Sequence, residues 1–269
     1  MTDQGFTADE IDTSRPHPAR MYDYFLGGRD NYEVDREAAE RVLDVVPEVV
    51  LGARANRDFL RRAVGYLVDS GVRQIIDIGT GIPTSPNTHE IAHAISPDVR
   101  VAYIDNDPIV ATHAGARLLG TGNTGFFLGD MRKPRSILEH PTIGELIDVR
   151  QPVALMLVSV LHFVADQDDP AGLIAAYRET LPPGSHLVLS HATGDFHGER
   201  AGDVAAVYKK ATASLTPRTH AQVLALFDGF DLVEPGLVQV HEWRPDEATQ
   251  VPDRPVGVYG AIGRLKEQA

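Results

Sequence analysis

Short apolar runs alternate along this chain with longer amphipathic segments. The run QIIDI at residues 74–78 is β-branched and carries a single charge near its end, which is typical of a parallel strand covered on both faces. Comparable runs predict further strands at residues 99–105, 125–130, 153–160 and 185–192. Each run is therefore expected to belong to one central sheet.

Helix-like segments separate these runs. In residues 54–70 the apolar side chains fall near one face of a helix, and Gly71 is placed to end it. Strands that alternate with helices indicate an α/β fold with a doubly wound, mostly parallel sheet, whose ligand lies at the carboxyl ends of the strands. Residues 237–243 and 256–265 are predicted to pair as a terminal antiparallel hairpin. Further helices are expected at residues 85–95, 108–119, 170–181, 201–214 and 217–228.

The N-terminal part differs from the rest of the chain. Residues 1–18 are polar and contain two prolines, which predicts a flexible leader. Residues 19–53 are predicted to form a helical cap, and residues 54–269 the main α/β domain. The cap concentrates aromatic side chains around a Gly-Gly turn. These aromatic side chains either dock the cap onto the domain or form a lid over the ligand.

Composition narrows the function. The net charge is −13 without a basic cluster, which argues against a nucleic-acid backbone as the main partner. The absence of cysteine excludes disulfides, thiolate zinc sites and a cysteine nucleophile. The N-terminus lacks the pattern of a signal peptide, and the longest apolar segment, residues 153–164, is too short to span a bilayer. We therefore expect a cytoplasmic protein without a membrane partner.

The strand at residues 74–78 leads into a glycine loop. Asp77 precedes Gly79 and Gly81, but Thr84 stands where the dinucleotide fingerprint has its third glycine, and no P-loop lysine follows. A carboxylate before the glycines opposes a pyrophosphate and suits a cationic ligand. Asp105 ends the next strand at about the interval where an acidic residue binds a ribose diol. Asp130, at the third strand end, is a candidate for the adenine amino group.

These motifs together resemble a known enzyme class. The sequence DIGTG at 77–81, Asp105 in YIDNDP, GD at 129–130 and LPPGSHLVLS resemble the class I S-adenosylmethionine-dependent methyltransferases. The N-terminal ARMYDYFLGGRDNYEVDREAA looks more specifically like an actinobacterial family of S-adenosyl methyltransferases, formerly described as a domain of unknown function. The resemblance implies a Rossmann-like, seven-stranded sheet with a reversed last strand. It departs at Pro83, where many such enzymes have a third loop glycine.

The resemblance also implies S-adenosyl-L-methionine as the cofactor. It implies that residues 20–32 close over the cofactor, which is consistent with the lid interpretation. The residues expected to bind the cofactor are Tyr24, Gly28, Asn31, Asp77, Gly79, Thr80, Gly81, Asp105, Asn106, Asp130, Met131 and Ser159.

Few residues qualify for chemistry on the methyl acceptor. His162 follows the fourth strand and is a candidate general base, although a histidine within the core or lining the cofactor is the alternative. HEIAH at 89–93 fits a zinc pattern, but its extended form fails, so no metal is expected. HATGDFHGE at 191–199 is interpreted as a solvated loop, with an acceptor-side loop or weak metal cluster as alternatives.

The sequence thus predicts an enzyme that transfers a methyl group from S-adenosylmethionine to a small-molecule acceptor. Positioning of the cofactor's methyl group can supply most of the rate without a dedicated catalytic side chain. Two alternatives stay open at this point. One is a non-catalytic binder of S-adenosylmethionine or S-adenosylhomocysteine, which would lack an acceptor cavity. The other is a nicotinamide-dependent oxidoreductase, which the missing third glycine disfavours.

Overall fold

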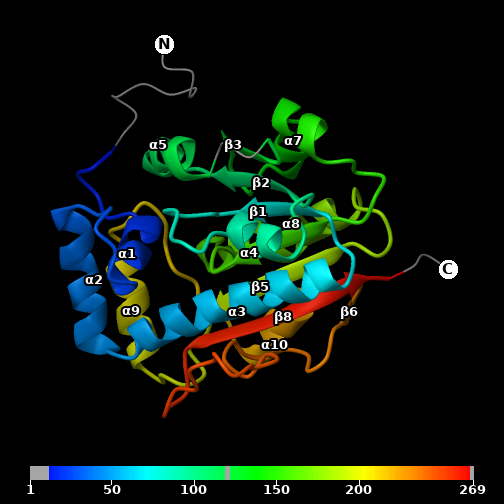
Figure 1. Ribbon diagram of the computed structural model, residues 1–269. Helices are drawn as coiled ribbons and strands as arrows, with labels where there is room; N and C mark the ends of the chain where they lie inside the picture. The colour runs from blue at the N-terminus through cyan, green and yellow to red at the C-terminus, as the bar shows by residue number, and fades with distance from the viewer. Residues whose placement is uncertain (1–11, 119–121, 267–269) are drawn as a thin grey trace.

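The structure is a computed structural model that describes residues 12–118 and 122–266. Within these residues eight strands form a single sheet, in the order β3-β2-β1-β4-β5-β8-β6, with β7 paired to β8 (Figure 1). The strands are β1 (Gln74–Ile78), β2 (Arg100–Asp105), β3 (Thr124–Leu128), β4 (Ala154–Val158), β5 (His186–Ala192), β6 (Phe230–Leu232), β7 (Val238–Gln239) and β8 (Val258–Leu265).

Strands β1 to β5 run parallel, and β8 runs antiparallel to both β5 and β6. The Rossmann-like sheet with a reversed last strand is therefore confirmed. The central strand β1 is buried at every position, so its β-branched residues pack against helices on both faces. In the register of β1, Asp77 pairs with Tyr103 of β2 and Met156 of β4.

Helices cover both faces of the sheet (Figure 1). One face packs against helices that include α3 (Val49–Asp69), α4 (Thr88–Ile95) and α5 (Pro108–Arg117). The other packs against α6 (Pro134–Leu138), α7 (Pro141–Leu146), α8 (Pro170–Arg178) and α10 (His220–Ala225). Two short 3-10 turns, η2 (Leu161–Phe163) and η3 (Asp166–Asp168), follow β4. Within the described part of the chain, no helix combines the length and apolar character needed to cross a membrane.

A separate helical layer lies at the carboxyl ends of the parallel strands. It consists of α1 (Pro18–Phe25), α2 (Glu33–Val45) and α9 (Arg200–Tyr208), which share an apolar cluster (Figure 1). Helix α1 begins at a proline, whose fixed φ and missing N–H suit the first helical position. The His17 side chain caps this helix by accepting a hydrogen bond from the Ala19 N–H. We call α1, α2 and α9 together the cavity roof.

Two sequence predictions need correction here. Residues 1–11 of the predicted leader lie outside the described residues, but residues 12–18 are tied to the domain and are not loose. The Arg15 guanidinium donates to the Ala211 carbonyl over 2.7 Å, and the Thr212 N–H donates to the Pro16 carbonyl over 3.0 Å. Pro18 starts a helix instead of preventing one.

The predicted terminal hairpin is confirmed only in its antiparallel sense. Residues 237–243 pair with β8 over just two positions, Val238 and Gln239. The chain then leaves the sheet because Val240 and Trp243 are fully buried in the core. The Arg62 guanidinium donates to the carbonyls of Val240 and Trp243 and so holds this segment against α3. The main partners of β8 are β5 and β6.

Candidate cofactor and acceptor site

A cavity of about 440 Å³ lies between the carboxyl ends of the strands and the roof. Its floor is formed by the loop after β1 and the end of β2, and we call residues 77–81 and 105–107 the cavity floor. Its other walls come from α1, α2, the start of α3, the segment after β4 and α9. The ligand position expected for a doubly wound sheet is thus the position of the cavity.

Asp105 links the two halves of the floor. Its Oδ2 accepts a hydrogen bond from the Gly81 N–H over 2.8 Å, and its Oδ1 accepts one from the Asp107 N–H over 3.0 Å. Burial raises the pKa of the Asp105 carboxyl, and these two N–H groups oppose the shift. Each oxygen keeps a lone pair for another donor, so the carboxylate can accept two ligand hydroxyl groups.

Asp77 is the second buried carboxylate of the floor. Its Oδ2 accepts a hydrogen bond from the Thr88 hydroxyl over 2.7 Å. Burial raises the pKa of Asp77 to about 6, while the Thr88 hydroxyl and the Arg57 charge lower it and Asp105 raises it. A ligand with positive charge at this end would favour the ionised form and would itself be stabilised by it.

The loop after β1 can follow its path because positions 79 and 81 are glycine. Gly79 has φ of +74°, and a Cβ there would lie 2.2 Å from Cγ2 of Val160. Gly81 has φ of +68°. The N–H groups of Gly79 and Thr80 both donate to the Ile104 carbonyl, which holds the loop against β2. Only glycine meets both demands at position 79 without strain.

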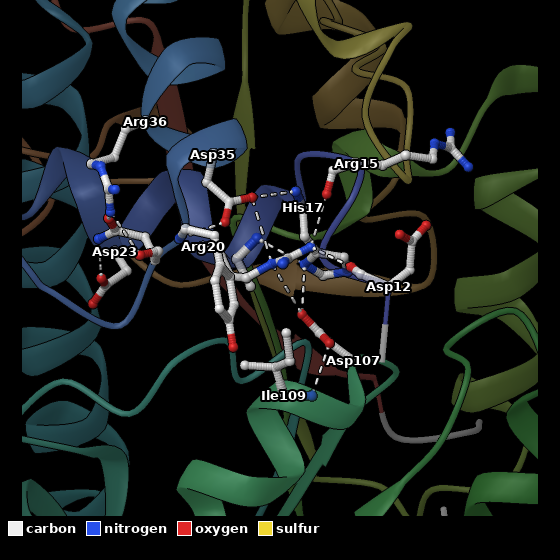
Figure 2. A network of polar contacts seen from close by, with 12 residues as sticks. Asp12, Arg15, His17, Arg20, Asp23, Asp35, Arg36, Asp107 and Ile109 are labelled. Carbon is white, nitrogen blue, oxygen red and sulfur yellow. Dashed lines mark hydrogen bonds and ion pairs between the residues drawn. The ribbon is translucent and has the colours of Figure 1, made fainter. Parts of the chain in front are cut away.

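Buried charges fasten the roof to the floor. Figure 2 shows Arg20 of α1 between Asp35 of α2 and Asp107, which caps α5. The Arg20 Nε lies 3.5 Å from Asp35 Oδ1 and 3.8 Å from Asp107 Oδ2, and Arg20 is 1% exposed. His17 Nδ1 lies 3.2 Å from the same Asp107 oxygen, and the His17 N–H donates to Asp35. We call His17, Arg20, Asp35 and Asp107 the clasp.

A polar chain crosses the cavity wall from the roof to the sheet. The Tyr22 hydroxyl donates to the Ala53 carbonyl and accepts from the Asn56 amide, whose Oδ1 accepts from the Ser190 hydroxyl over 2.6 Å. The Ser190 hydroxyl also accepts from the Ser159 N–H over 2.9 Å. Ser159 has φ of +54°, a strained value that its place in this chain stabilises.

His162 lines the cavity just beyond β4. Its Nδ1 accepts a hydrogen bond from the Ala192 N–H over 3.2 Å, so the neutral ring carries its proton on Nε2. Burial, with the neighbouring His191 and the Arg218 charge, holds the pKa of His162 well below its usual value. A neutral ring with a protonated Nε2 donates a hydrogen bond. The predicted role of general base stays a prediction, and this geometry does not support it.

The structure brings most of the predicted site residues together. The cavity is lined by Asp77, Gly79, Thr80, Gly81, Asp105, Asn106, Met131, Ser159 and His162.

The remaining predicted residues lie outside that lining, so their contact with a cofactor stays a prediction. The Tyr24 hydroxyl donates to Glu40, and the Asn31 amide donates to Asp23 over 2.7 Å. Gly28 packs its backbone against the Asp23 carboxylate. Asp130 is occupied by Arg132, with Nη2 and Oδ2 2.8 Å apart.

Other cavity residues were not predicted from the sequence. Thr88 and Tyr208 carry no motif. Arg20 and Asp107 lie inside the segments that carry the family resemblance but had no predicted role, and Asp107 before Pro108 is also a helix-start signal. The loop at 191–199, interpreted as solvated, contributes Thr193 and His197 to the lining. The HEIAH histidines are engaged elsewhere: His89 Nδ1 with the Tyr103 hydroxyl and His93 Nε2 with the Val99 carbonyl.

Comparison with known proteins identifies the family. The sequence profile of a family described as S-adenosyl methyltransferase matches residues 4–266. The chain belongs to this family. A solved structure of a DUF574 family protein from Streptomyces avermitilis MA-4680 is 44% identical, with a TM-score of 0.91, and the match covers 95% of this chain and 99% of that chain.

A second solved structure, described as a candidate methyltransferase from Thermobifida fusca YX, is 37% identical with a TM-score of 0.89 over 95% of this chain and 97% of that chain. Human N-acetylserotonin methyltransferase, solved with S-adenosylmethionine, is 16% identical with a TM-score of 0.51, over 97% of this chain and 65% of that chain. That similarity shows the fold alone. No curated protein gives a match.

The cofactor of this methyltransferase family is S-adenosylmethionine, and the cavity fits it. The cofactor carries a sulfonium, an ammonium and a ribose diol but no phosphate. Asp105 has free lone pairs for the diol, and Asp77 supplies negative charge for the cationic groups. In addition, Arg20 Nε, Arg20 Nη1 and Asp107 Oδ2 are buried without a hydrogen-bond partner among the described residues, beside the cavity. A bound ligand can satisfy such atoms.

Proposed function

We propose that this protein transfers the methyl group of S-adenosylmethionine to a small-molecule acceptor. The observation that carries the proposal is the continuity of the cavity. It runs without interruption from the acidic floor to a second, largely apolar part between η2 and α9, where Phe163, Val204 and Tyr208 line it. A protein that only binds the cofactor has no need of this second part.

The cofactor supplies an activated methyl group on its sulfonium. The chain itself supplies binding, orientation and exclusion of water. Asp77 supplies charge for the cationic groups and Asp105 accepts from the ribose diol, while α1, α2 and α9 of the roof line the cavity on the side away from the floor. Bringing the acceptor atom into line with the methyl group can provide about 7–11 kcal/mol of the barrier reduction. No residue of the cavity has to form a covalent bond.

Calorimetric titration with S-adenosylhomocysteine tests the cofactor half of this proposal. Asp105→Ala removes the carboxylate offered to the ribose diol, so we expect affinity to fall roughly thirtyfold or more, about 2 kcal/mol for a pair of charge-assisted hydrogen bonds. Asp98→Ala is the control, because Asp98 is exposed and remote from the cavity. An unchanged affinity of the Asp105 variant would contradict the ribose assignment.

A turnover assay tests whether the protein transfers the methyl group. Wild-type protein is incubated with S-adenosylmethionine and a panel of small acceptors, and release of S-adenosylhomocysteine is followed over time. Acceptor-dependent release supports transfer. Tight cofactor binding with no release above the acceptor-free rate, across acceptors that bind in the cavity, would favour the non-catalytic binder instead.

A further inference from the structure

We propose that the part of the cavity between η2 and α9 takes an uncharged, mainly apolar acceptor about the size of one aromatic ring, and that His162 donates a hydrogen bond from Nε2 to an oxygen of that acceptor. This inference rests on the proposed function and names its substrate class. We call this part the acceptor compartment and define its lining as Phe25, Leu26, Val49, Phe163, Val204 and Tyr208.

The walls of the acceptor compartment are apolar and come from four elements. Phe25 ends α1 and Leu26 follows it, Val49 lies on α3, Phe163 on η2, and Val204 and Tyr208 on α9. The rings of Phe163 and Tyr208 are 5.7 Å apart. All six residues belong to, or pack against, one apolar cluster, and the partial exposure of Leu26, Val49, Phe163 and Val204 fits side chains that face the cavity. Such walls favour an apolar ligand.

Glu48, which lines the cavity next to Val49 of the compartment, is already paired. Glu48 Oε1 lies 3.2 Å from Arg200 Nη2 and 3.6 Å from His197 Nδ1. Burial would raise the pKa of Glu48, but the backbone, Arg200 and His197 together lower it, so the carboxylate stays ionised and paired. An anionic acceptor would meet the Glu48 carboxylate, and the Arg200 charge beside it is already paired with that carboxylate. A cationic acceptor would have to displace Arg200 from Glu48. An uncharged acceptor meets neither cost.

His162 is fixed as a donor by its surroundings. The Ala192 peptide donates its N–H to His162 Nδ1, and its carbonyl lies 2.7 Å from His191 Nδ1. His191 Nε2 lies 2.9 Å from Arg218 Nη1, and Arg218 Nη2 in turn donates to Asp166 over 2.6 Å. Arg218 always carries its protons, so His191 accepts at Nε2 and keeps its proton on Nδ1. These contacts fix the neighbouring His191, and the Ala192 N–H donated to Nδ1 places the proton of the neutral His162 ring on Nε2.

The N–H group at Nε2 of His162 favours a methyl acceptor that carries an oxygen atom. This nitrogen has no hydrogen-bond partner within the described residues, although His162 lines the cavity and its ring lies 4.4 Å from that of Phe163. The Tyr208 hydroxyl is likewise without a partner in the described part of the chain. These polar groups at the edge of an apolar compartment suit one oxygen on an otherwise apolar molecule.

Volume limits the size of the acceptor. The whole cavity measures about 440 Å³, which lies toward the low end of the roughly 300–1,000 Å³ usual for ligand sites. Because the cofactor occupies part of this space, the acceptor compartment has room for little more than a single ring. A protein or nucleic-acid acceptor would have to reach it beneath α1.

Size-matched probes test the charge and polarity of the compartment. Phenol, benzoate and benzylamine are titrated by calorimetry into wild-type protein saturated with S-adenosylhomocysteine. We expect phenol to bind and the two charged compounds to bind roughly tenfold more weakly. Equal or tighter binding of benzoate or benzylamine would overturn the uncharged class. Failure of S-adenosylhomocysteine to bind would instead overturn the proposed function, so the two failures are distinguishable.

Variants then locate the binding. Val204→Phe fills the compartment and should weaken phenol roughly tenfold while leaving S-adenosylhomocysteine affinity unchanged. Val207→Phe is the matched control, because Val207 lies on the same helix and outside the cavity lining. Equal effects of the two substitutions would remove the compartment as the binding site.

His162 is tested by comparing a donor with an apolar residue. His162→Gln restores an N–H donor but cannot act as a base at neutral pH, whereas His162→Leu removes the donor. We expect Gln to keep phenol affinity within about threefold of wild type and Leu to lose roughly tenfold. If Gln and Leu lose phenol equally while both still bind S-adenosylhomocysteine, the donor role is overturned.

Discussion

The floor and the roof of the same cavity are built in different ways. The floor residues come from two neighbouring segments of one β-α-β unit, the loop after β1 and the end of β2, and their positions follow from strand and turn geometry. The roof combines α1 and α2 with α9, which lies far away along the chain. The floor is acidic and polar, whereas the roof residues that line the proposed acceptor compartment are apolar. The part of the cavity that fits the cofactor is thus built by local structure, and the proposed acceptor compartment by long-range packing.

The largest effect is expected where the roof meets the floor. Arg20→Met keeps the bulk of the side chain but leaves Asp35 and Asp107 buried without their cation. Removing one partner of a buried ionic group costs about 3–5 kcal/mol. We expect the free energy of unfolding, measured by urea titration, to fall by that amount.

Arg36→Met serves as the control for Arg20→Met. Arg36 lies on α2 and is exposed, and within residues 12–118 and 122–266 its guanidinium donates only to Asn31. Its replacement should change the free energy of unfolding by less than about 0.5 kcal/mol. If the free energy of unfolding falls by the same small amount in both variants, the clasp does not stabilise the roof. The roof would then not depend on buried charges in the way proposed here.

The next largest effect is a change in the free energy of unfolding with pH, caused by ionisation of Asp77 in the cavity floor. Burial raises the pKa of Asp77 to about 6 from 3.8, so the folded protein holds this proton more tightly than the unfolded chain does. The stabilisation is present below about pH 4 and is lost as the pH rises to about 6, where the folded state must also ionise Asp77. Without ligand, the cost reaches about 3 kcal/mol.

Asp77→Asn isolates this contribution, because the amide oxygen can still accept from Thr88. Between pH 4 and pH 6.5 the free energy of unfolding of wild type should fall relative to the variant. In the same range the affinity of wild type for cationic S-adenosylmethionine should rise, since the cation favours the ionised carboxylate. If the free energy of unfolding changes with pH by the same amount in both proteins, ionisation of the buried Asp77 does not destabilise the folded state.

The same contrast explains what the sequence could predict. Asp77, Gly79 and Asp105 were predicted because a strand followed by a glycine turn, and then an acidic residue at the next strand end, is a local pattern with a fixed geometry. The parallel, doubly wound sheet followed from the alternation of strands and helices, and the reversed last strand from the family resemblance.

The roof could not be derived in this way. Tyr208 and Val204 reach the cavity only because α9 packs on α2, and nothing near them in the sequence indicates that contact. Arg20 and Asp35 belong to the N-terminal segment that carries the family resemblance, but nothing in the sequence shows that the fold buries them together with Asp107. The aromatic residues around Gly27 suggested a lid, but which of them face the cavity depends on the helical phase of α1. Tyr22 and Phe25 line it, whereas Tyr24 points to Glu40.

The smallest expected effect on S-adenosylhomocysteine affinity is that of Asp130. The sequence pattern predicts a cofactor contact for this residue, whereas the structure pairs it with Arg132. Its neighbours Gly129 and Met131 line the cavity, but its carboxylate is held by Arg132 through contacts of 2.8–3.1 Å. The Arg132 charge and N–H groups also lower the pKa of Asp130 against the effect of burial. Asp130→Ala should therefore weaken S-adenosylhomocysteine binding by less than about threefold, under 1 kcal/mol, since a partly exposed ion pair is all that it removes.

Calorimetry on Asp130→Ala, Arg132→Ala and the double variant decides whether the adenine amino group uses this carboxylate. If Asp130 stays with Arg132 in the complex, all three proteins bind S-adenosylhomocysteine about as well as wild type. If the carboxylate turns to the ligand, Arg132→Ala frees it and tightens binding, while Asp130→Ala weakens binding as strongly as Asp105→Ala does. The second pattern would add Asp130, which follows β3, to the carboxylates of the cavity floor. The ligand would then replace Arg132 as the hydrogen-bond partner of Asp130.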